Sequence, residues 1–350
     1  MNYPDFLDIN DTVGYVAPSF GCAIEPYRTA FMRAREVFSK KRLSEELGPN
    51  CFADDGIGIS TTPEKCAREF MDMYASETNQ ALISCGGGEL MCEILPYMDF
   101  EVIYRAKPKW FMGYSDNTNL TFLLTTALDI ATIYGPCISS FGMDPWHRSI
   151  RDAFDLLTGA DTVVSKGEDG VITVSVHNYD GWENESAKDE EHPFAPYQIS
   201  ELFIPAIYGG REAEGRLIGG CLDVLNNIAG TRFDRVKAFN SRYADDGVLW
   251  YLESCDLNVM DMRRALWHLR ECGWFENATG FLIGRPMHFD EPMFGLNRHT
   301  AVTEVLKDMG VPIIMDLDIG HLPPMMPIIN GSYGRASCRG RAFGLEMELR

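Results

Sequence analysis

The stretch WFMGYSDNTNL occupies residues 110–120 and decides the fold, because it joins a strand pattern to a helix pattern through a sharp turn. Its apolar first half, residues 110–114, is typical of a buried strand, and helical spacing follows over residues 118–128. Ser115 lies between them, in the setting of a nucleophile elbow, where a serine hydroxyl rises above a sheet. A second interpretation is that Ser115 caps the helix, since Asn117 stands where G-x-S-x-G has its second glycine.

The same alternation of strands and helices extends to both sides of this stretch. Short apolar runs at residues 13–17 and 81–83 predict strands, and residues 27–38 have helical spacing. Such alternation predicts a parallel sheet covered on both faces, with ligands at the carboxyl ends of its strands. Two turns stand out there, at Ser115 and at the three glycines 86–88. Further strands are expected at residues 102–104, 131–134, 248–252, 280–283 and 311–315, and further helices at 63–74, 89–97, 222–228, 260–269 and 301–309.

The length of 350 residues suggests two domains. We expect an α/β fold with an N-terminal parallel-sheet domain over residues 1–160, which contains Ser115. A β-rich α/β domain should follow over residues 206–350, and residues 161–205 should connect the two. Within this connection, residues 180–191 hold six acids, which is typical of an exposed loop. Trp182 lies among them, and we expect it either to form a ligand platform or to pack under the loop as an anchor.

The composition excludes several classes of protein. The formal net charge is −20, which argues against general affinity for nucleic acid or an anionic membrane. No apolar run is long enough to span a bilayer, and the N-terminus lacks the pattern of a secretory signal. The ten cysteines form no C-x-x-C pair, so neither a metal site nor a disulfide framework is expected. Together these features predict a cytoplasmic protein with reduced, buried cysteines.

A serine nucleophile needs a base, and the base needs an acid that orients it. Among the seven histidines, His321 is the best placed, because it follows Gly320 just past a predicted strand and precedes a rigid Pro-Pro turn. Glu253 ends a strongly apolar strand. Taken singly, each residue also has a plain interpretation: a structural histidine at a strand end, and a solvated carboxylate at the edge of a sheet.

Four motifs in one order along the chain resemble the serine LD-carboxypeptidase family, which includes the microcin C self-immunity peptidases. The resemblance extends from about residue 13 to residue 343 and includes the order Ser, Glu, His. The motifs are GYSDNTNL (113–120), GRLIGGCLDVL (215–225), Leu252-Glu253 after a hydrophobic strand, and GHLPPMMPI (320–328).

The resemblance implies a role for each matched residue. Ser115 would be the nucleophile, His321 the general base and acid, and Glu253 the group that orients the imidazole. The backbone N–H groups of Gly88 and Asp116 would form an oxyanion hole, and Gly87 would adjoin the substrate beside them. The resemblance also implies that the N-terminal domain carries the nucleophile and that a smaller, β-rich C-terminal domain supplies the Glu and the His. Members of this family use no metal or cofactor, and they are commonly homodimers.

Two departures from the family pattern bear on the substrate, namely Cys221 in place of Asn and Gly86 in place of Arg or Ile. The loop around Trp182 resembles the immunity subgroup, in which a loop aromatic residue stacks on a nucleotide base. The resemblance therefore implies hydrolysis of an amide in a peptidyl- or aminoacyl-nucleotide conjugate. Removal of D-alanine from a murein tetrapeptide is the alternative. A binding module on a hydrolase scaffold and a glutamine amidotransferase-like enzyme are further alternatives, although the latter needs a cysteine nucleophile.

Overall fold

The computed structural model describes the whole chain except residues 190, 191 and 193, and the described chain divides into two compact units. The first unit comprises Met1–Val163 and Asp189–Pro196, and the second comprises Val164–Lys188 and Tyr197–Arg350. The predicted connecting segment is divided between the units, and two of its six acids, Glu190 and Glu191, lie outside the described residues.

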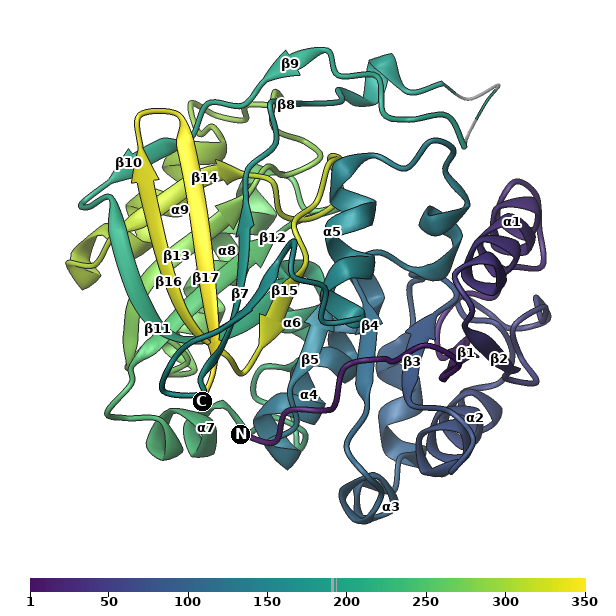
Figure 1. Cartoon of the computed structure of the whole chain (residues 1–350). Coiled ribbons are helices and arrows are strands. Elements are labelled where there is room, and N and C mark those ends of the chain that lie inside the picture. Colours follow the sequence, from purple (N-terminus) through teal and green to yellow (C-terminus); the bar gives the residue numbers. More distant parts are fainter. Residues whose placement is uncertain (190–191, 193) are drawn as a thin grey trace. The chain divides into compact units, whose positions relative to one another are not determined.

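Strands and helices alternate in the first unit, as the sequence predicts (Figure 1). Its strands are β1 (Thr12–Val16), β2 (Ser44–Leu47), β3 (Ala81–Ser84), β4 (Trp110–Gly113) and β5 (Thr132–Tyr134). Its α-helices are α1 (Tyr27–Lys40), α2 (Pro63–Ala75), α3 (Phe100–Arg105), α4 (Thr118–Leu128) and α5 (Arg148–Leu157). Its 3₁₀ helices are η1 (Met91–Tyr97), η2 (Ser115–Asn117) and η3 (Ile138–Gly142).

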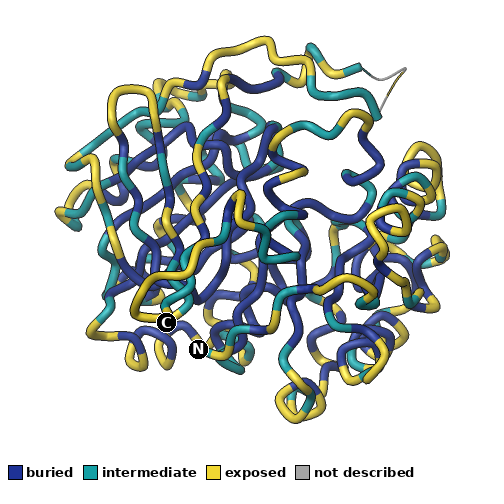
Figure 2. The backbone as a smooth tube through the Cα atoms, viewed as in Figure 1, coloured by how far each residue is buried: buried dark blue, intermediate teal, exposed yellow. Residues whose placement is uncertain are grey.

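The strands of the first unit pair in parallel in the order β5-β4-β3-β1-β2. Every residue of β3 and β4 is buried, as expected for strands covered on both faces (Figure 2). Because the strands are parallel, the turns after β1, β3 and β4 leave the sheet at one edge. This edge carries Ser19, the glycines 86–88 and Ser115.

The strand expected at residues 102–104 is wrong, because this segment lies in the helix α3. The Asp99 carboxylate accepts the N–H of Glu101 and so caps the start of the helix. Ile103 is buried, whereas Val102 and Tyr104 are exposed. A run of three apolar residues is too short to distinguish a strand from a short helix by periodicity alone.

The second unit is built on one mixed sheet with the order β10-β14-β13-β12-β11-β16-β17-β7-β6 (Figure 1). The strands from β11 to β14 pair in parallel, and the others pair antiparallel. This architecture, with the parallel first unit, confirms the predicted fold class. This unit contains the strands β6 (Val164–Lys166), β7 (Ile172–His177), β8 (Gly181–Trp182), β9 (Glu201–Leu202), β10 (Ala206–Tyr208), β11 (Glu212–Cys221), β12 (Val248–Glu253), β13 (Ala278–Gly284), β14 (Ile313–Leu317), β15 (Ile328–Asn330), β16 (Tyr333–Arg339) and β17 (Ala342–Leu349). Of these, β8, β9 and β15 lie outside the mixed sheet, and β8 pairs with β9 in a two-stranded sheet of its own. The helices are η4 (Glu185–Ala187), α6 (Leu222–Ile228), α7 (Val236–Arg242), α8 (Val259–Glu271), α9 (Arg298–Leu306) and η5 (Lys307–Met309).

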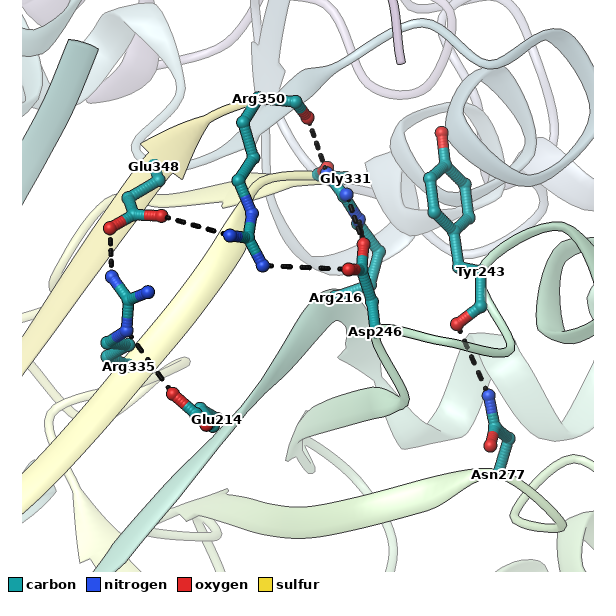
Figure 3. A network of polar contacts seen from close by, with 9 residues as sticks. All are labelled: Glu214, Arg216, Tyr243, Asp246, Asn277, Gly331, Arg335, Glu348 and Arg350. Carbon is teal, nitrogen blue, oxygen red and sulfur yellow. Dashed lines mark hydrogen bonds and ion pairs between the residues drawn. The ribbon is translucent and has the colours of Figure 1, made fainter. Parts of the chain in front are cut away.

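A polar network connects the start of β12 with β11 and with the chain end after β17 (Figure 3). Arg216 on β11 is buried and pairs with Asp246, which precedes β12. The Arg216 guanidinium also donates to the main-chain oxygens of Gly331 and Arg350, each at 2.9 Å. Arg350 in turn pairs with Asp246 and Glu348. The buried arginine therefore meets several acceptors at once, as a buried charge requires.

Membrane-spanning helices and clustered metal ligands are both absent from the described part of the chain. No helix there is both long enough and apolar enough to cross a membrane. No group of three or more His, Cys, Asp or Glu side chains there is arranged to hold a metal ion. The ten cysteines are all free thiols.

Candidate active site

Ser115 lies in the turn after β4, on the carboxyl edge of the first sheet. Its φ angle is +63°, in the left-handed region that costs a residue with a side chain about 1–2 kcal/mol. The strand β4 ends at Gly113, and Ser115 begins the 3₁₀ turn η2 before α4. The N-cap position of α4 is held by Asn117, so Ser115 does not occupy the capping position considered from the sequence. Its backbone N–H donates to the Tyr134 hydroxyl at 3.2 Å.

The glycine-rich turn after β3 lies directly against this serine. A Cβ atom on Gly87 would lie 3.3 Å from the Ser115 Oγ atom and 3.2 Å from its Cβ atom. The Asn117 side chain joins the two turns, because its Nδ2 donates to the Gly86 carbonyl at 2.8 Å and to the Tyr114 carbonyl at 3.0 Å. The amide that departs from G-x-S-x-G therefore connects the serine turn to the glycine turn.

The Asp116 side chain makes a second connection on the buried side of the turn. Its carboxylate accepts the Ser19 hydroxyl at 2.5 Å, the Met91 backbone N–H at 2.9 Å and the Asn119 amide at 3.0 Å. Burial raises the pKa of the Asp116 carboxyl to about 6, although the hydrogen bonds from Ser19 and Met91 lower it. Asp116 therefore connects the turn after β1 and the segment after the glycines to the turn that holds Ser115.

Glu253 and His321 meet in the second unit. Glu253 is the last residue of β12, and His321 follows β14 after a turn at Gly320. The His321 Nδ1 atom lies 2.7 Å from the Glu253 Oε2 atom, and the Glu253 side chain is fully buried. Gly320 has a φ of +101°, and a Cβ there would lie 2.4 Å from Oε2, so the glycine is required for this approach.

The charge of Glu253 governs the protonation of the imidazole. Burial lowers the pKa of His321, but the Glu253 charge and hydrogen bonds with Cys255 and Glu253 outweigh burial, so the pKa lies well above its ordinary value. The arrangement is one in which a carboxylate orients an imidazole and stabilises its charged form.

Two cysteines flank this pair, and one of them was not singled out from the sequence. The Cys255 thiol hydrogen-bonds to His321 and lies 3.7 Å from the Met287 sulfur. Cys221, a departure from the family pattern, is buried at the end of β11, and its Cα partner across the sheet is Glu253. The position of Cys255, two residues after Glu253 at the same strand end, is the signal that could have identified it.

Trp182 lies in the segment predicted to be an exposed loop, but the residue itself is only 8% exposed. Its ring packs edge-on against Phe289, with centroids 5.1 Å apart, and Arg285 lies over its face at 5.0 Å. Arg285 in turn pairs with the buried Asp318 at 2.5 Å. These partners lie more than a hundred residues further along the chain, so local composition did not reveal them.

The segment around Trp182 is also bound to the segment that carries His321. The backbone N–H of Tyr179 donates to the Asp318 carboxylate, and that of Glu183 donates to the Pro323 carbonyl, both at 2.8 Å. Within the second unit, the segment that contains Trp182 therefore packs against the turn that carries His321 and stabilises it. A role in binding a nucleotide base stays a prediction.

The predicted site residues thus fall into two groups, one in each unit. The first unit brings together Ser115, Asp116, Gly87 and Gly88 along one edge of its sheet. The second unit brings Glu253 and His321 into direct contact.

The chain is similar to known proteins over most of its length. A family model described as the LD-carboxypeptidase N-terminal domain matches residues 13–135, and one described as the LD-carboxypeptidase C-terminal domain matches residues 214–335. The microcin C7 self-immunity protein MccF of Escherichia coli is 24% identical and covers 92% of this chain and 89% of its own. A Bacillus subtilis protein named as a probable murein peptide carboxypeptidase is 26% identical, over 95% of this chain and 91% of its own. A solved structure of MccF with aspartyl sulfamoyl adenosine has a TM-score of 0.80 at 22% identity, over 99% of this chain and 98% of that one.

Proposed function

Since the chain belongs to the LD-carboxypeptidase family, we propose that it is a serine peptidase whose catalytic triad is Ser115, His321 and Glu253. Its substrate is an amide in a peptidyl- or aminoacyl-nucleotide conjugate. The proposal joins the strained serine of the first unit to the imidazole–carboxylate pair of the second.

Each residue has a step in the reaction. His321, with Nδ1 held by Glu253, takes the Ser115 proton at Nε2 while the serine oxygen attacks the amide carbonyl carbon. The backbone N–H groups of Gly88 and Asp116 hold the oxygen that becomes negative. His321 then gives the proton to the departing nitrogen, and the C–N bond breaks to leave an acyl-serine. Water, deprotonated by the same imidazole, releases the acid and restores Ser115.

The observation that carries the proposal is the backbone of Ser115. A serine that serves only as a helix cap needs no left-handed φ, whereas an elbow that presents a hydroxyl above a sheet does. The close approach of Gly87 to the serine Oγ adds to this, because it leaves room beside the hydroxyl for a reacting carbonyl. A protein kept only for binding has no need of either feature.

The relatives support the choice of substrate. A relative named for microcin C7 self-immunity matches nearly the whole chain, and the solved structure with the same fold holds an aminoacyl sulfamoyl adenosine. The murein tetrapeptide is the second candidate, supported by the Bacillus subtilis relative. The family resemblance also supports a cytoplasmic protein and a homodimer. Light scattering of the purified protein would test the dimer.

The test compares two substrates on two proteins. Wild type and Ser115→Ala are assayed with aspartyl sulfamoyl adenosine and with a murein tetrapeptide, and the release of sulfamoyl adenosine or D-alanine is followed by chromatography. We expect wild type to cleave the conjugate and the variant to lose at least about 10³-fold in turnover. Cleavage of the tetrapeptide alone would assign the murein substrate. Equal turnover by the two proteins would refute the serine mechanism.

A further inference from the structure

Ser19 is a buried serine that the reaction scheme above does not use. It lies after β1 in the first unit and is 0% exposed. Its hydroxyl donates to the Asp116 Oδ2 atom at 2.5 Å, and the same oxygen accepts the Met91 N–H at 2.9 Å. One carboxylate oxygen therefore joins the turn after β1, the segment after the glycines and the serine turn.

Ser19 also lies against Gly88, the other residue proposed to hold the reacting oxygen. A Cβ atom built on Gly88 would lie 2.0 Å from the Ser19 Oγ and 3.1 Å from the Phe20 nitrogen, so no side chain fits there. The next residue, Phe20, donates its N–H to the Gly87 carbonyl at 2.8 Å. The turn after β1 thus contacts Gly88 through one atom of Ser19 and holds Asp116 through the same atom.

The turn is itself fixed from behind. The Ala17 N–H donates to the buried Glu69 carboxylate at 2.9 Å, and the Ser60 hydroxyl donates to the Ala17 carbonyl at 2.6 Å. The Ser60 N–H donates to the Ser19 carbonyl at 2.7 Å. With its main chain held at both ends, Ser19 has little freedom to follow a movement of Gly88 or Asp116.

We propose that Ser19 is a positioning residue that sets the spacing of the two oxyanion donors, the backbone N–H groups of Gly88 and Asp116. The inference rests on the proposed peptidase function. An oxyanion hole works only when both donors aim at the position of the developing charge, and a displacement near 1 Å is costly. Among the described side chains, those of Ser19 and Asn119 donate to the Asp116 carboxylate, and of these two only Ser19 is among the atoms nearest to a Cβ built on Gly88.

The test compares Ser19→Ala with Ser60→Ala, which is a matched control. Both serines are buried and both donate one hydroxyl hydrogen bond, but Ser60 lies in the segment before α2 and its hydroxyl bonds to neither Gly88 nor Asp116. Ser60→Ala keeps the main-chain bond from Ser60 to Ser19 and the bond from Ala17 to Glu69, so the turn after β1 stays held. The hydrolysis of aspartyl sulfamoyl adenosine gives kcat and KM, the labelling rate with a fluorophosphonate reports acylation, and thermal melts report stability.

For Ser19→Ala we expect kcat and the labelling rate to fall about 10- to 100-fold, less than the loss of a whole oxyanion donor, while KM stays within about threefold. Ser60→Ala should melt at a similarly lowered temperature but keep kcat within about threefold. If Ser19→Ala does not fold, Asp116→Asn should show the same fall in kcat, because it removes one acceptor oxygen from the junction. Wild-type kcat in the folded Ser19 variant, or equal losses in both serine variants, overturns the inference. Equal turnover by wild type and Ser115→Ala would refute the proposed peptidase function itself. A failure of the Ser19 inference alone would leave the large loss in Ser115→Ala in place, so the two failures are distinguishable.

Discussion

Replacing Glu253 with glutamine should remove the negative charge that faces His321 while keeping the size of the side chain. The two side chains meet at 2.7 Å, and the carboxylate is fully buried, which makes the contact a charge-assisted hydrogen bond. With charge centres about 4 Å apart and an effective dielectric near 20, the attraction is about 4 kcal/mol. Burial of the imidazole opposes it, so the pKa of His321 should fall below its ordinary value once the charge is gone.

Two measurable consequences follow for Glu253→Gln. Turnover should fall on the order of 10³- to 10⁴-fold, because the amide stabilises neither the correct tautomer nor the charge of the imidazole. The pH dependence of stability should also change. A histidine with a raised folded pKa stabilises wild type fully below about pH 6.5 and progressively less as pH rises through the folded pKa, and the variant should lose this contribution.

An NMR titration of the His321 ring, assigned by its absence in His321→Gln, measures the pKa directly. Urea unfolding at several pH values measures stability, and Glu304→Gln serves as control because it removes an exposed acid of the same unit that pairs only with Lys307 in the contacts described. The reasoning is refuted if the pKa of His321 stays raised in Glu253→Gln, or if turnover falls less than about tenfold.

Three further changes test other parts of the structure. Trp182→Ala should lower the free energy of unfolding by about 3–5 kcal/mol in urea titrations, because it empties the space against Phe289 and Arg285. A loss below about 1 kcal/mol contradicts the anchoring contacts, and a loss of activity on nucleotide conjugates alone would support the stacking role. Burial raises the pKa of Glu69 to about 7, so the free energy of unfolding of wild type should fall by about 3 kcal/mol as pH rises from 4.5 to 7. Glu69→Gln should lack this fall, and an unchanged pH slope in the variant speaks against the buried, raised carboxyl. Ser115→Gly should end fluorophosphonate labelling yet raise stability by up to about 1 kcal/mol over Ser115→Ala, which keeps the left-handed strain; equal melting temperatures would count against that strain.

Local pattern in the sequence was enough to predict the elements that carry the proposed site residues. The apolar run before Ser115 and the helical spacing after it correspond to β4 and α4, and Glu253 ends β12 as expected. These segments are strongly apolar and bounded by turn residues, so periodicity alone identifies them. Residues 102–104 lacked such length, and the capping aspartate before them decided for a helix.

Contacts between distant parts of the chain could not be predicted in the same way. Ser19 and Asp116 are 97 residues apart, and nothing in either segment indicates that a hydroxyl of one meets a carboxylate of the other. The neighbours of Trp182 in sequence are acidic and predict an exposed loop, whereas its neighbours in space are an aromatic ring and a paired arginine. Burial is a property of the tertiary fold, and charged neighbours in sequence do not exclude it.

The left-handed backbone at Ser115 predicts which residue would replace the serine if hydrolysis were no longer required. A laboratory selection for heat resistance alone would favour glycine at this turn, since glycine adopts a positive φ without steric cost. The product would keep its sheets and its glycine turn and would still hold ligands, but it would cut nothing. The residue at position 115 in a relative therefore separates lineages maintained for turnover from those maintained for capture.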